Sequence, residues 1–377
     1  MLEVIKNKYE YYIYNNNKDN ETFKYINLNF TKDQYKLKGL NYLDKIRNNK
    51  ITKKIKINDY PKISVIIPIY NCENSIELTL KSIHFQNLNE IEIILINYYS
   101  LDNSPKIIEE IKNFDQRINI INNHKNMGTL YSRCIGALNA KGKFIIGLDN
   151  DDLFLYEEVL ETLYLYSKIN YFDIIEIKSF NIPNYHPKFE DINNGAFIYH
   201  PDNLILYQPE LGRFSISNNN KLEFTDHFAW GKLIRSNIYK TAIYKLGKKR
   251  YSQYNCWTED ISIVFVLFNM ANSFIFLNLF GIFRIIAKTT ASYRLSNEHK
   301  LITDIFYLGI IFDFSKNDFI TKDYVAQYAL SFKINEVEKI DRKNRMLFKS
   351  IIKKIINCKY ISKDYKKKLI KFETLIK

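Results

Sequence analysis

The chain has 377 residues, of which 46% are hydrophobic and 25% are charged, so it can bury a sizeable core and is not disordered as a whole. Its length suits two domains, or one domain with large appendages. The net charge of +14 is compatible with an anionic ligand or surface, but residues 338–377 alone carry 14 Lys and Arg against 4 Asp and Glu, so the remainder is far less basic.

Residues 1–60 are expected to form an N-terminal extension that contains one helix. Its apolar residues recur at a spacing close to that of a helix, at Leu37, Leu40, Leu43 and Ile46. Gly39 inside this stretch weakens the prediction. The extension carries no pattern that indicates chemistry, and it lacks the apolar segment of a signal peptide.

Strands and helices alternate regularly from residue 62 onward. Near-continuous apolar runs indicate central parallel strands, and amphipathic segments indicate helices between them. Ser104-Pro105 opens one helix with proline at its first position, and Gly142 stands where the cap of another is expected. Alternation in units of roughly 30 residues predicts an α/β fold, with a mostly parallel sheet and helices on both faces. Strands are expected at Ile63–Pro68, Ile91–Ile96, Ile118–Ile121, Phe144–Gly147 and Asp173–Ser179, and helices at Thr129–Asn139, Tyr156–Ser167 and Ile261–Met270.

The second half of the chain is less regular. Residues 180–255 are aromatic and are expected to be irregular, either as an acceptor portion or as a structural insertion. The apolar window Ile261–Ala287 is interrupted by asparagines, and is expected to divide into a helix and a strand rather than to span a membrane. The predicted organisation is an N-terminal extension at 1–60, a domain at 61–295 with halves 61–180 and 181–295, and a helical basic C-terminal region at 296–377.

The four cysteines are widely separated and match neither a zinc site nor a disulfide framework. We therefore expect reduced thiols in a cytosol-like compartment. The predicted location is cytoplasmic, and the basic C-terminal region leaves peripheral contact with a membrane open.

The acidic stretch Leu148–Asp152 directly follows the fourth predicted strand. Its three carboxylates repel one another, which raises their pKa values. A divalent cation removes this repulsion, and oxygen ligands suit Mg²⁺ or Mn²⁺. A solvated acidic loop is the alternative, but open α/β sheets bind ligands at the carboxyl ends of their strands, which favours a metal site.

A second acidic pair, Glu259-Asp260, follows Trp257 at the start of the apolar helix. Acidic side chains at that position interact favourably with the helix dipole. The pair therefore fits either a simple helix start capped by Thr258 or a functional site, and spacing alone leaves both readings open.

Several segments, in this order, resemble the family-2 glycosyltransferases of the GT-A fold over residues 62 to about 290. They are Ser64–Asn71, Asn126–Gly128, Ser132-Arg133, Ala140–Lys143, Asp149–Asp152 and Glu259-Asp260. The last two match the DxD and ED elements of the family. The resemblance implies an inverting, Mn²⁺- or Mg²⁺-dependent transfer of a sugar from a nucleotide-diphosphate sugar to a hydroxyl of a glycan, lipid or protein. The expected donor is a UDP-sugar.

The same resemblance implies roles for individual residues. Asp260 corresponds to the general base, with Glu259 beside it as a second catalytic residue. Asp151 and Asp149 correspond to the metal-contacting acids, and Trp257 is the candidate for acceptor binding. The positions assigned to donor binding are Pro68, Tyr70, Glu73, Asn97, Arg133, Asp149 and Asn150.

One departure from the family lies at the end of the second strand, where two adjacent acids and a glycine are usual. This chain has Asn97-Tyr98-Tyr99 there. Asn97 can hydrogen-bond a base but not as an anion, so a catalytically inactive module that binds sugar nucleotides or glycans is the alternative function. A sugar-nucleotide pyrophosphorylase would need a Gly-rich basic loop, which Tyr70–Asn74 is not. No nucleic-acid partner is expected, since only the basic tail suggests one.

Overall fold

The structure is a computed structural model that describes residues 11–13, 24–26, 30–56, 59–194, 204–207, 228–252, 259–286, 296–315 and 319–376. Its strands are β1 (Tyr11–Ile13), β2 (Lys24–Ile26), β3 (Ile63–Ile69), β4 (Ile91–Asn97), β5 (Ile118–Asn122), β6 (Phe144–Gly147), β7 (Leu153–Phe154), β8 (Ile174–Ile182), β9 (Asn193–Asn194), β10 (Leu204–Tyr207), β11 (Lys232–Arg235) and β12 (Ser273–Ile285).

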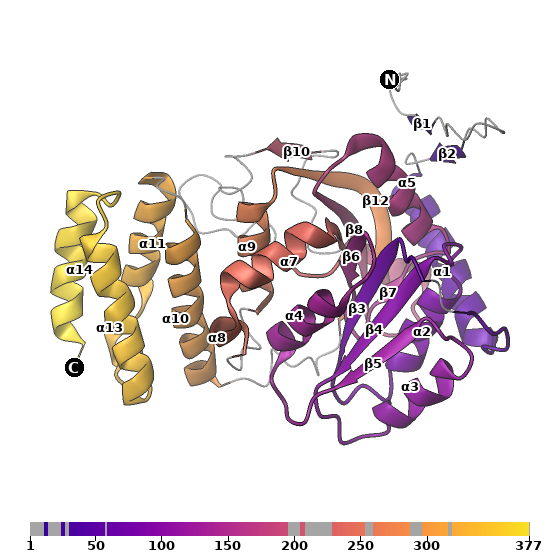
Figure 1. Ribbon diagram of the computed structural model, residues 1–377, viewed down its shortest axis with the longest axis horizontal. Helices are drawn as coiled ribbons and strands as arrows, with labels where there is room; N and C mark the ends of the chain where they lie inside the picture. Colours follow the sequence, from indigo (N-terminus) through magenta and orange to yellow (C-terminus); the bar gives the residue numbers. More distant parts are fainter. Residues whose placement is uncertain are drawn as a thin grey trace.

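Its helices are α1 (Lys32–Asn48), α2 (Ile76–His84), α3 (Ser104–Lys112), α4 (Thr129–Asn139), α5 (Val159–Asn170), η1 (Phe189–Asp191, a 3₁₀ turn), α7 (Ser236–Leu246), α8 (Lys248–Tyr251), α9 (Glu259–Met270), α10 (Asn297–Phe314), α11 (Phe319–Ser331), α12 (Ile334–Val337), α13 (Arg342–Asn357) and α14 (Lys363–Leu375). The long axis of the molecule runs from α1, α2 and α3 at one end to α13 and α14 at the other (Figure 1).

The main sheet has ten strands, eight of which follow the order β10-β12-β8-β11-β6-β3-β4-β5. β6, β3, β4 and β5 run parallel to one another, and so do β8 and β12. β11 lies antiparallel between β6 and β8. The predicted mostly parallel sheet is therefore confirmed.

Every residue of β3 and β4 is buried, which accounts for their near-continuous apolar sequences. Right-handed crossovers place α2 and α3 on one face of the sheet, and α4, which returns toward β6, on the other. There α4 packs with α7 and α9, while α1 packs on α2 (Figure 1). Helices on both faces are thus confirmed as well.

The expectation of irregular structure between residues 180 and 255 is wrong for the segments that form the end of β8, η1, β9, β10, β11, α7 and α8. β11 has only four residues, too few for a periodic pattern to be recognised. It becomes a strand because Leu233 pairs with Ile146 on one side and with Ile175 on the other.

Gly142 is not the cap of α4, because that helix ends at Asn139 and Ala140 takes the cap position. A Cβ atom on Gly142 would lie 2.6 Å from the backbone nitrogen of Ser64. The backbone N–H of Gly142 also donates to Ser64 Oγ at 2.9 Å. Glycine is needed here because the loop passes directly against β3.

The helix expected in the N-terminal extension is confirmed as α1. It begins with a capping box in which Thr31 and Gln34 exchange hydrogen bonds. Leu37 is 56% exposed, and Tyr42 contributes to the buried face instead. A Cβ atom on Gly39 would lie 2.5 Å from the side chain of Leu155, so the glycine lets α1 pack closely on the domain.

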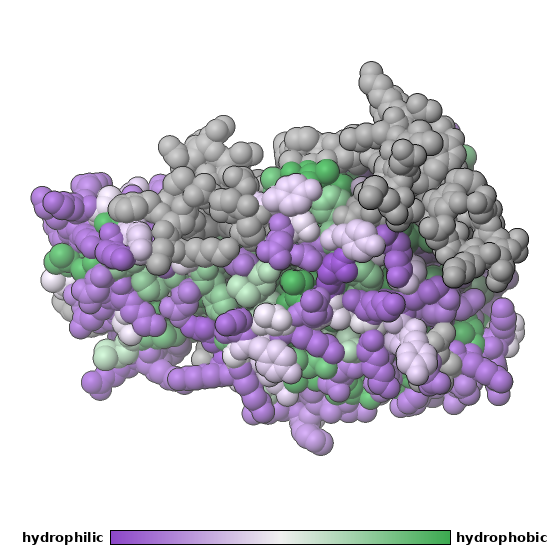
Figure 2. All heavy atoms as spheres, turned by 45° about the horizontal axis from the view of Figure 1, so that its top comes forward, coloured by the Kyte–Doolittle hydropathy of each residue, from purple (hydrophilic) through white to green (hydrophobic). Residues whose placement is uncertain are grey.

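The helices α10, α11, α13 and α14 form the C-terminal end of the molecule (Figure 1). On the face shown in Figure 2, the visible surface at this end is mostly hydrophilic with separate hydrophobic spots. The apolar window that begins at Ile261 divides into α9 and β12, as predicted. Across the residues that the structure describes, no helix combines the length and the apolar content needed to cross a membrane.

Candidate active site

The candidate site lies where the carboxyl ends of β3, β4 and β6 meet at one edge of the sheet. The acidic turn, Asp149–Asp152, begins two residues after β6 ends. Carboxylate oxygens of Asp149, Asp151 and Asp152 all lie within 4.8 Å of one another. The fold therefore brings the three predicted acids together rather than spreading them into solvent.

Two hydrogen bonds tie the acidic turn to its neighbours. Asn150 Nδ2 donates to the carbonyl oxygen of Pro68 on β3 at 3.0 Å. Thr79 Oγ1 of α2 donates to the carbonyl oxygen of Asn150, also at 3.0 Å. Asn150 thus holds the turn against β3 and α2, which fixes the backbone that carries the neighbouring aspartates.

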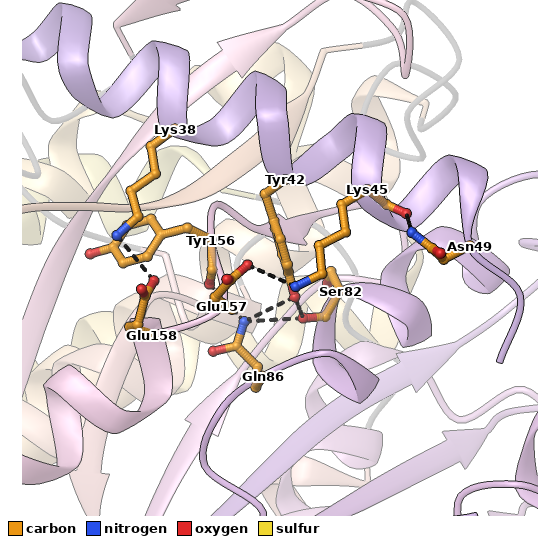
Figure 3. Close-up of polar contacts among 9 residues, drawn as sticks. All are labelled: Lys38, Tyr42, Lys45, Asn49, Ser82, Gln86, Tyr156, Glu157 and Glu158. Atoms are coloured by element: carbon orange, nitrogen blue, oxygen red, sulfur yellow. Dashed lines mark hydrogen bonds and ion pairs between the residues drawn. The ribbon is translucent and has the colours of Figure 1, made fainter. Parts of the chain in front are cut away.

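Helix α1 supports the segment that follows the acidic turn (Figure 3). Tyr42 Oη donates to the carbonyl oxygen of Ser82 at 2.8 Å. Gln86 Nε2 donates to the carbonyl oxygens of Ser82 and Tyr156, and Gln86 Oε1 accepts from the N–H of Leu160 at the start of α5. Two ion pairs flank these bonds, Lys45–Glu157 at 3.2 Å and Lys38–Glu158 at 3.0 Å.

A second connection runs from α1 to the acidic turn itself. Arg47 Nη1 donates to the carbonyl oxygen of Tyr185 at 2.6 Å, and Tyr185 Oη donates to the carbonyl oxygen of Asp151 at 2.9 Å. The N-terminal extension showed no chemistry in its sequence, yet it helps to position Asp151.

The acids of the turn disfavour one another's charged forms. Burial, followed by the charge of Asp149, raises the pKa of Asp151 to about 6. Burial also raises the pKa of Asp152 well above its usual value. Asp152 is 2% exposed; its Oδ1 accepts from the N–H of Ile285, and its Oδ2 has no hydrogen-bond partner among the described residues. An oxygen-only set of repelling carboxylates fits a hard divalent cation.

The raised pKa of Asp151 predicts a pH-dependent stability effect in the metal-free protein. The folded state holds this proton more tightly than the unfolded state, so stability falls as pH rises from about 4 to about 6. We expect Asp151→Asn to stabilise the protein at pH 7 by up to about 3 kcal/mol, and to have little effect at pH 4. Urea unfolding with a chelator present measures both values, with exposed Asp59→Asn as the control. Destabilisation by Asp151→Asn at pH 7 would contradict the prediction.

Arg133, on α4, connects the acidic turn to the second acidic element. Its Nη2 donates to Asp149 Oδ1 at 2.6 Å, and its Nε lies 3.4 Å from Asp260 Oδ1. The Arg133 side chain is 3% exposed. Burial alone lowers its pKa, but the charges of Asp260 and Asp149 outweigh that effect and raise it, so the guanidinium stays charged. Asp260 therefore lies beside the acidic turn, at the start of α9.

The residues assigned to donor binding at the ends of β3 and β4 mostly hold two turns together. Glu73 Oε2 accepts from both the N–H and the side-chain amide of Asn103. Asn97 Nδ2 donates to Asn122 Oδ1, and Asn97 Oδ1 accepts from the N–H of Ser100. These bonds use both the amide nitrogen and the amide oxygen of Asn97, so fewer hydrogen bonds are left for the nucleobase that this residue is predicted to bind.

The aromatic rings at this edge present a flat surface. Tyr70 and Tyr98 stack with ring centroids 4.9 Å apart and planes inclined by 10°. Tyr70 is 36% exposed. Tyr99 adopts φ 80°, a conformation that favours glycine, at the position where the family usually has one. Residue 99 therefore has a glycine-like backbone conformation although it is a tyrosine.

The side chains of two predicted residues, Trp257 and Glu259, are not described. Trp257 lies outside the described residues, and Glu259 is described as the first residue of α9 without its side chain. Sequence reasoning missed Tyr185 and Arg284, which lie near the acidic turn. Arg284 had a detectable signal, since it is the only charged residue in the 13-residue strand β12.

The sequence is similar to those of known glycosyltransferases. Residues 64–241 match glycosyl transferase family 2. Glycosyltransferase GlyA of Streptococcus pneumoniae is 31% identical over 193 residues, which are 50% of this chain and 26% of GlyA. An uncharacterized glycosyltransferase of Haemophilus influenzae is 29% identical over 209 residues, 53% of this chain and 60% of that protein. The chain thus spans less than two thirds of both relatives.

A solved structure is also similar. S. aureus TarS, residues 1–349, in complex with UDP-GlcNAc, has a TM-score of 0.56 at 16% identity, and the match covers 79% of this chain and 81% of that one. At this identity the likeness shows that the two chains share a fold.

Proposed function

We propose that the chain transfers a sugar from a nucleotide-diphosphate sugar to a hydroxyl acceptor, because residues 64–241 match glycosyl transferase family 2 and the chain shares its fold with S. aureus TarS. The observation that carries this proposal is the contact of Arg133 with both Asp149 and Asp260, because it draws the acidic turn and the start of α9 to one point. TarS was solved with UDP-GlcNAc and with UDP, which supports a UDP-sugar as the donor.

In this proposal the donor lies along the carboxyl ends of β3, β4 and β6. The stacked rings of Tyr70 and Tyr98 offer a surface for the nucleobase, and Asp149 lies near the ribose. Arg133 stabilises the negative charge that develops on the leaving diphosphate, since a preformed buried cation needs no reorganisation. Residues that hold the surrounding turns are Pro68, Glu73, Asn97 and Asn150.

Asp149 and Asp151 would hold a Mn²⁺ or Mg²⁺ ion. Such an ion, when bound, supplies Lewis-acid charge to the diphosphate. The fit rests on the chain's own residues: three mutually repelling carboxylates, an elevated Asp151 pKa, and a buried Asp152 oxygen without a hydrogen-bond partner among the described residues.

Asp260 is assigned the role of general base. It takes the proton of the acceptor hydroxyl while that oxygen bonds to the anomeric carbon and the bond from this carbon to the diphosphate oxygen breaks. Attack from the face opposite the leaving group inverts the anomeric centre. Glu259 is assigned a supporting role, and Trp257 an acceptor contact. We place the donor site in residues 61–180 and the acceptor, a glycan, lipid or protein, against residues 181–295.

The test is a screen of UDP-, GDP-, dTDP- and CMP-sugars by thermal shift, with and without Mn²⁺, followed by an assay for donor hydrolysis. We expect one UDP-sugar with Mn²⁺ to stabilise the protein, by about 2.7 kcal/mol at 100 times its Kd. Slow release of UDP should accompany binding. Stabilisation by none of the donors would contradict the proposal.

The second candidate function is an inactive module that binds sugar nucleotides or glycans. It is favoured by Asn97 and Tyr98, which replace the family's two acids, and by the internal hydrogen bonds of the Asn97 amide. Donor binding without any hydrolysis or transfer would select this alternative.

A further inference from the structure

Arg284 lies at the carboxyl end of β12, directly beside the acidic turn. The next residue, Ile285, donates its N–H to Asp152 Oδ1 at 3.2 Å. β7, which follows the acidic turn, pairs antiparallel with β12 through Phe283 and Leu153. The register therefore holds residue 284 close to the acids, although it is over a hundred residues away in sequence.

Two aromatic rings hold the Arg284 guanidinium. Its central carbon lies 4.8 Å from the ring centroid of Phe228 and 5.8 Å from that of Trp230. Trp230 is 2% exposed, so this surface is rigid. The N–H of Gly231 donates to the carbonyl oxygen of Gly147 at 3.3 Å, which fixes the aromatic segment against the end of β6. Cation–π contacts orient an arginine without using its N–H groups.

The Arg284 side chain is partly exposed, and within the described part of the chain no hydrogen bond or ion pair to its guanidinium is present. Other arginines differ: Arg117, Arg133 and Arg235 each face a carboxylate within 4 Å. Burial raises the pKa of Asp151 and Asp152, and the charge of Arg284 works against that rise, as expected for a cation close to both. The Arg284 guanidinium is thus held beside the acidic turn, and its N–H groups have no hydrogen-bond partner among the described residues.

We propose that Phe228, Trp230 and Arg284 form an anion subsite that binds a phosphate or carboxylate group of a substrate. A guanidinium matches both groups through two parallel hydrogen bonds. The anion is either the diphosphate of the donor or an acidic group of the acceptor. In both cases anionic oxygen atoms bind the Arg284 guanidinium beside the acidic turn. This inference rests on the proposed glycosyl transfer. It adds that one of the two substrates must carry a negatively charged group that binds Arg284.

The test uses Arg284→Gln and Arg284→Lys, with Arg235→Gln as the matched control. Arg235 also lies over an aromatic ring, Phe144, at 5.4 Å, but it is paired with Asp173. The ligands for calorimetry with Mn²⁺ are UDP, uridine and inorganic pyrophosphate for the donor source. Methyl glucuronide and glycerol 1-phosphate serve for the acceptor source.

If the anion is the diphosphate, Arg284→Gln should weaken UDP and pyrophosphate binding by about 10- to 100-fold and leave uridine binding unchanged. If it belongs to the acceptor, UDP affinity should stay constant and the acidic acceptor ligands should lose affinity by a similar factor. Arg284→Lys keeps the charge without the fork, so its loss should be smaller, and the control should match the wild type.

Unchanged affinity of Arg284→Gln for all these ligands would overturn the anion subsite. Failure of the wild type to bind any nucleotide would instead count against the proposed function, and pyrophosphate binding would still report on Arg284. Thermal midpoints of the variants check that they fold; if Arg284→Gln does not, Arg284→Lys carries the comparison.

Discussion

Asp260→Asn is expected to reduce the rate of sugar transfer by on the order of 10²- to 10⁴-fold, the usual contribution of a general base. Asn has nearly the same shape as Asp and keeps a carbonyl oxygen toward Arg133, but it cannot accept the proton of the acceptor hydroxyl. Donor binding should change little, because Arg133 retains its stronger contact with Asp149 at 2.6 Å.

Initial rates at saturating donor and calorimetric UDP titrations separate these two effects. Asp173→Asn is the matched control: Asp173 also pairs with an arginine, Arg235, at 3.3 Å, but it precedes β8 and lies at the opposite edge of the sheet. Near-normal turnover in Asp260→Asn would show that another group removes the proton. A parallel loss of UDP binding would show that Asp260 acts mainly by positioning Arg133.

Asp151→Ala is expected to remove metal-dependent donor binding. The wild type should bind UDP more tightly with Mn²⁺ than with a chelator, by roughly 100-fold or more if the ion contributes several kcal/mol. In Asp151→Ala the two affinities should converge, and transfer should be lost with them. Asp149 would remain as a ligand, but one carboxylate that is shared with Arg133 is too little to hold the ion, and Asp152 is buried and accepts from the N–H of Ile285.

Stability distinguishes this outcome from misfolding. Because ionised Asp151 is unfavourable in the metal-free protein, its removal should not lower the unfolding free energy at pH 7. The carbonyl oxygen of residue 151 still accepts from Tyr185 Oη, so the turn keeps that support. An undiminished Mn²⁺ effect on UDP affinity in the folded variant would refute the assignment of Asp151 as a metal ligand.

Much of the fold could be predicted from the sequence, because a buried strand or helix has a recognisable run or spacing of apolar residues. β3 and β4 are buried along their whole length, so most of their residues are apolar, and both strands begin at the predicted residue. The acidic turn and the pair at the start of α9 could be identified because each follows or opens an apolar element. The order of these motifs along the chain then indicated the family.

Very short elements, and contacts between residues far apart in the sequence, could be identified only in the tertiary structure. β11 has only four residues, and it is a strand because it fills the space between β6 and β8. Gly142 was taken for a helix cap, whereas it is required by the approach of a loop to Ser64. The role of α1 in supporting the acidic turn depends on contacts between residues far apart in sequence, such as Arg47 and Tyr185.

The sequence by itself determined the alternation of strands and helices and which acids stand at the ends of elements. The tertiary structure decided which side chains meet: Arg133 between Asp149 and Asp260, and Arg284 on its aromatic surface beside Asp152. The physical reason is that hydrophobic burial is non-directional and shows in local composition, whereas an ion pair or a ring contact depends on strand order and register, which no local pattern records.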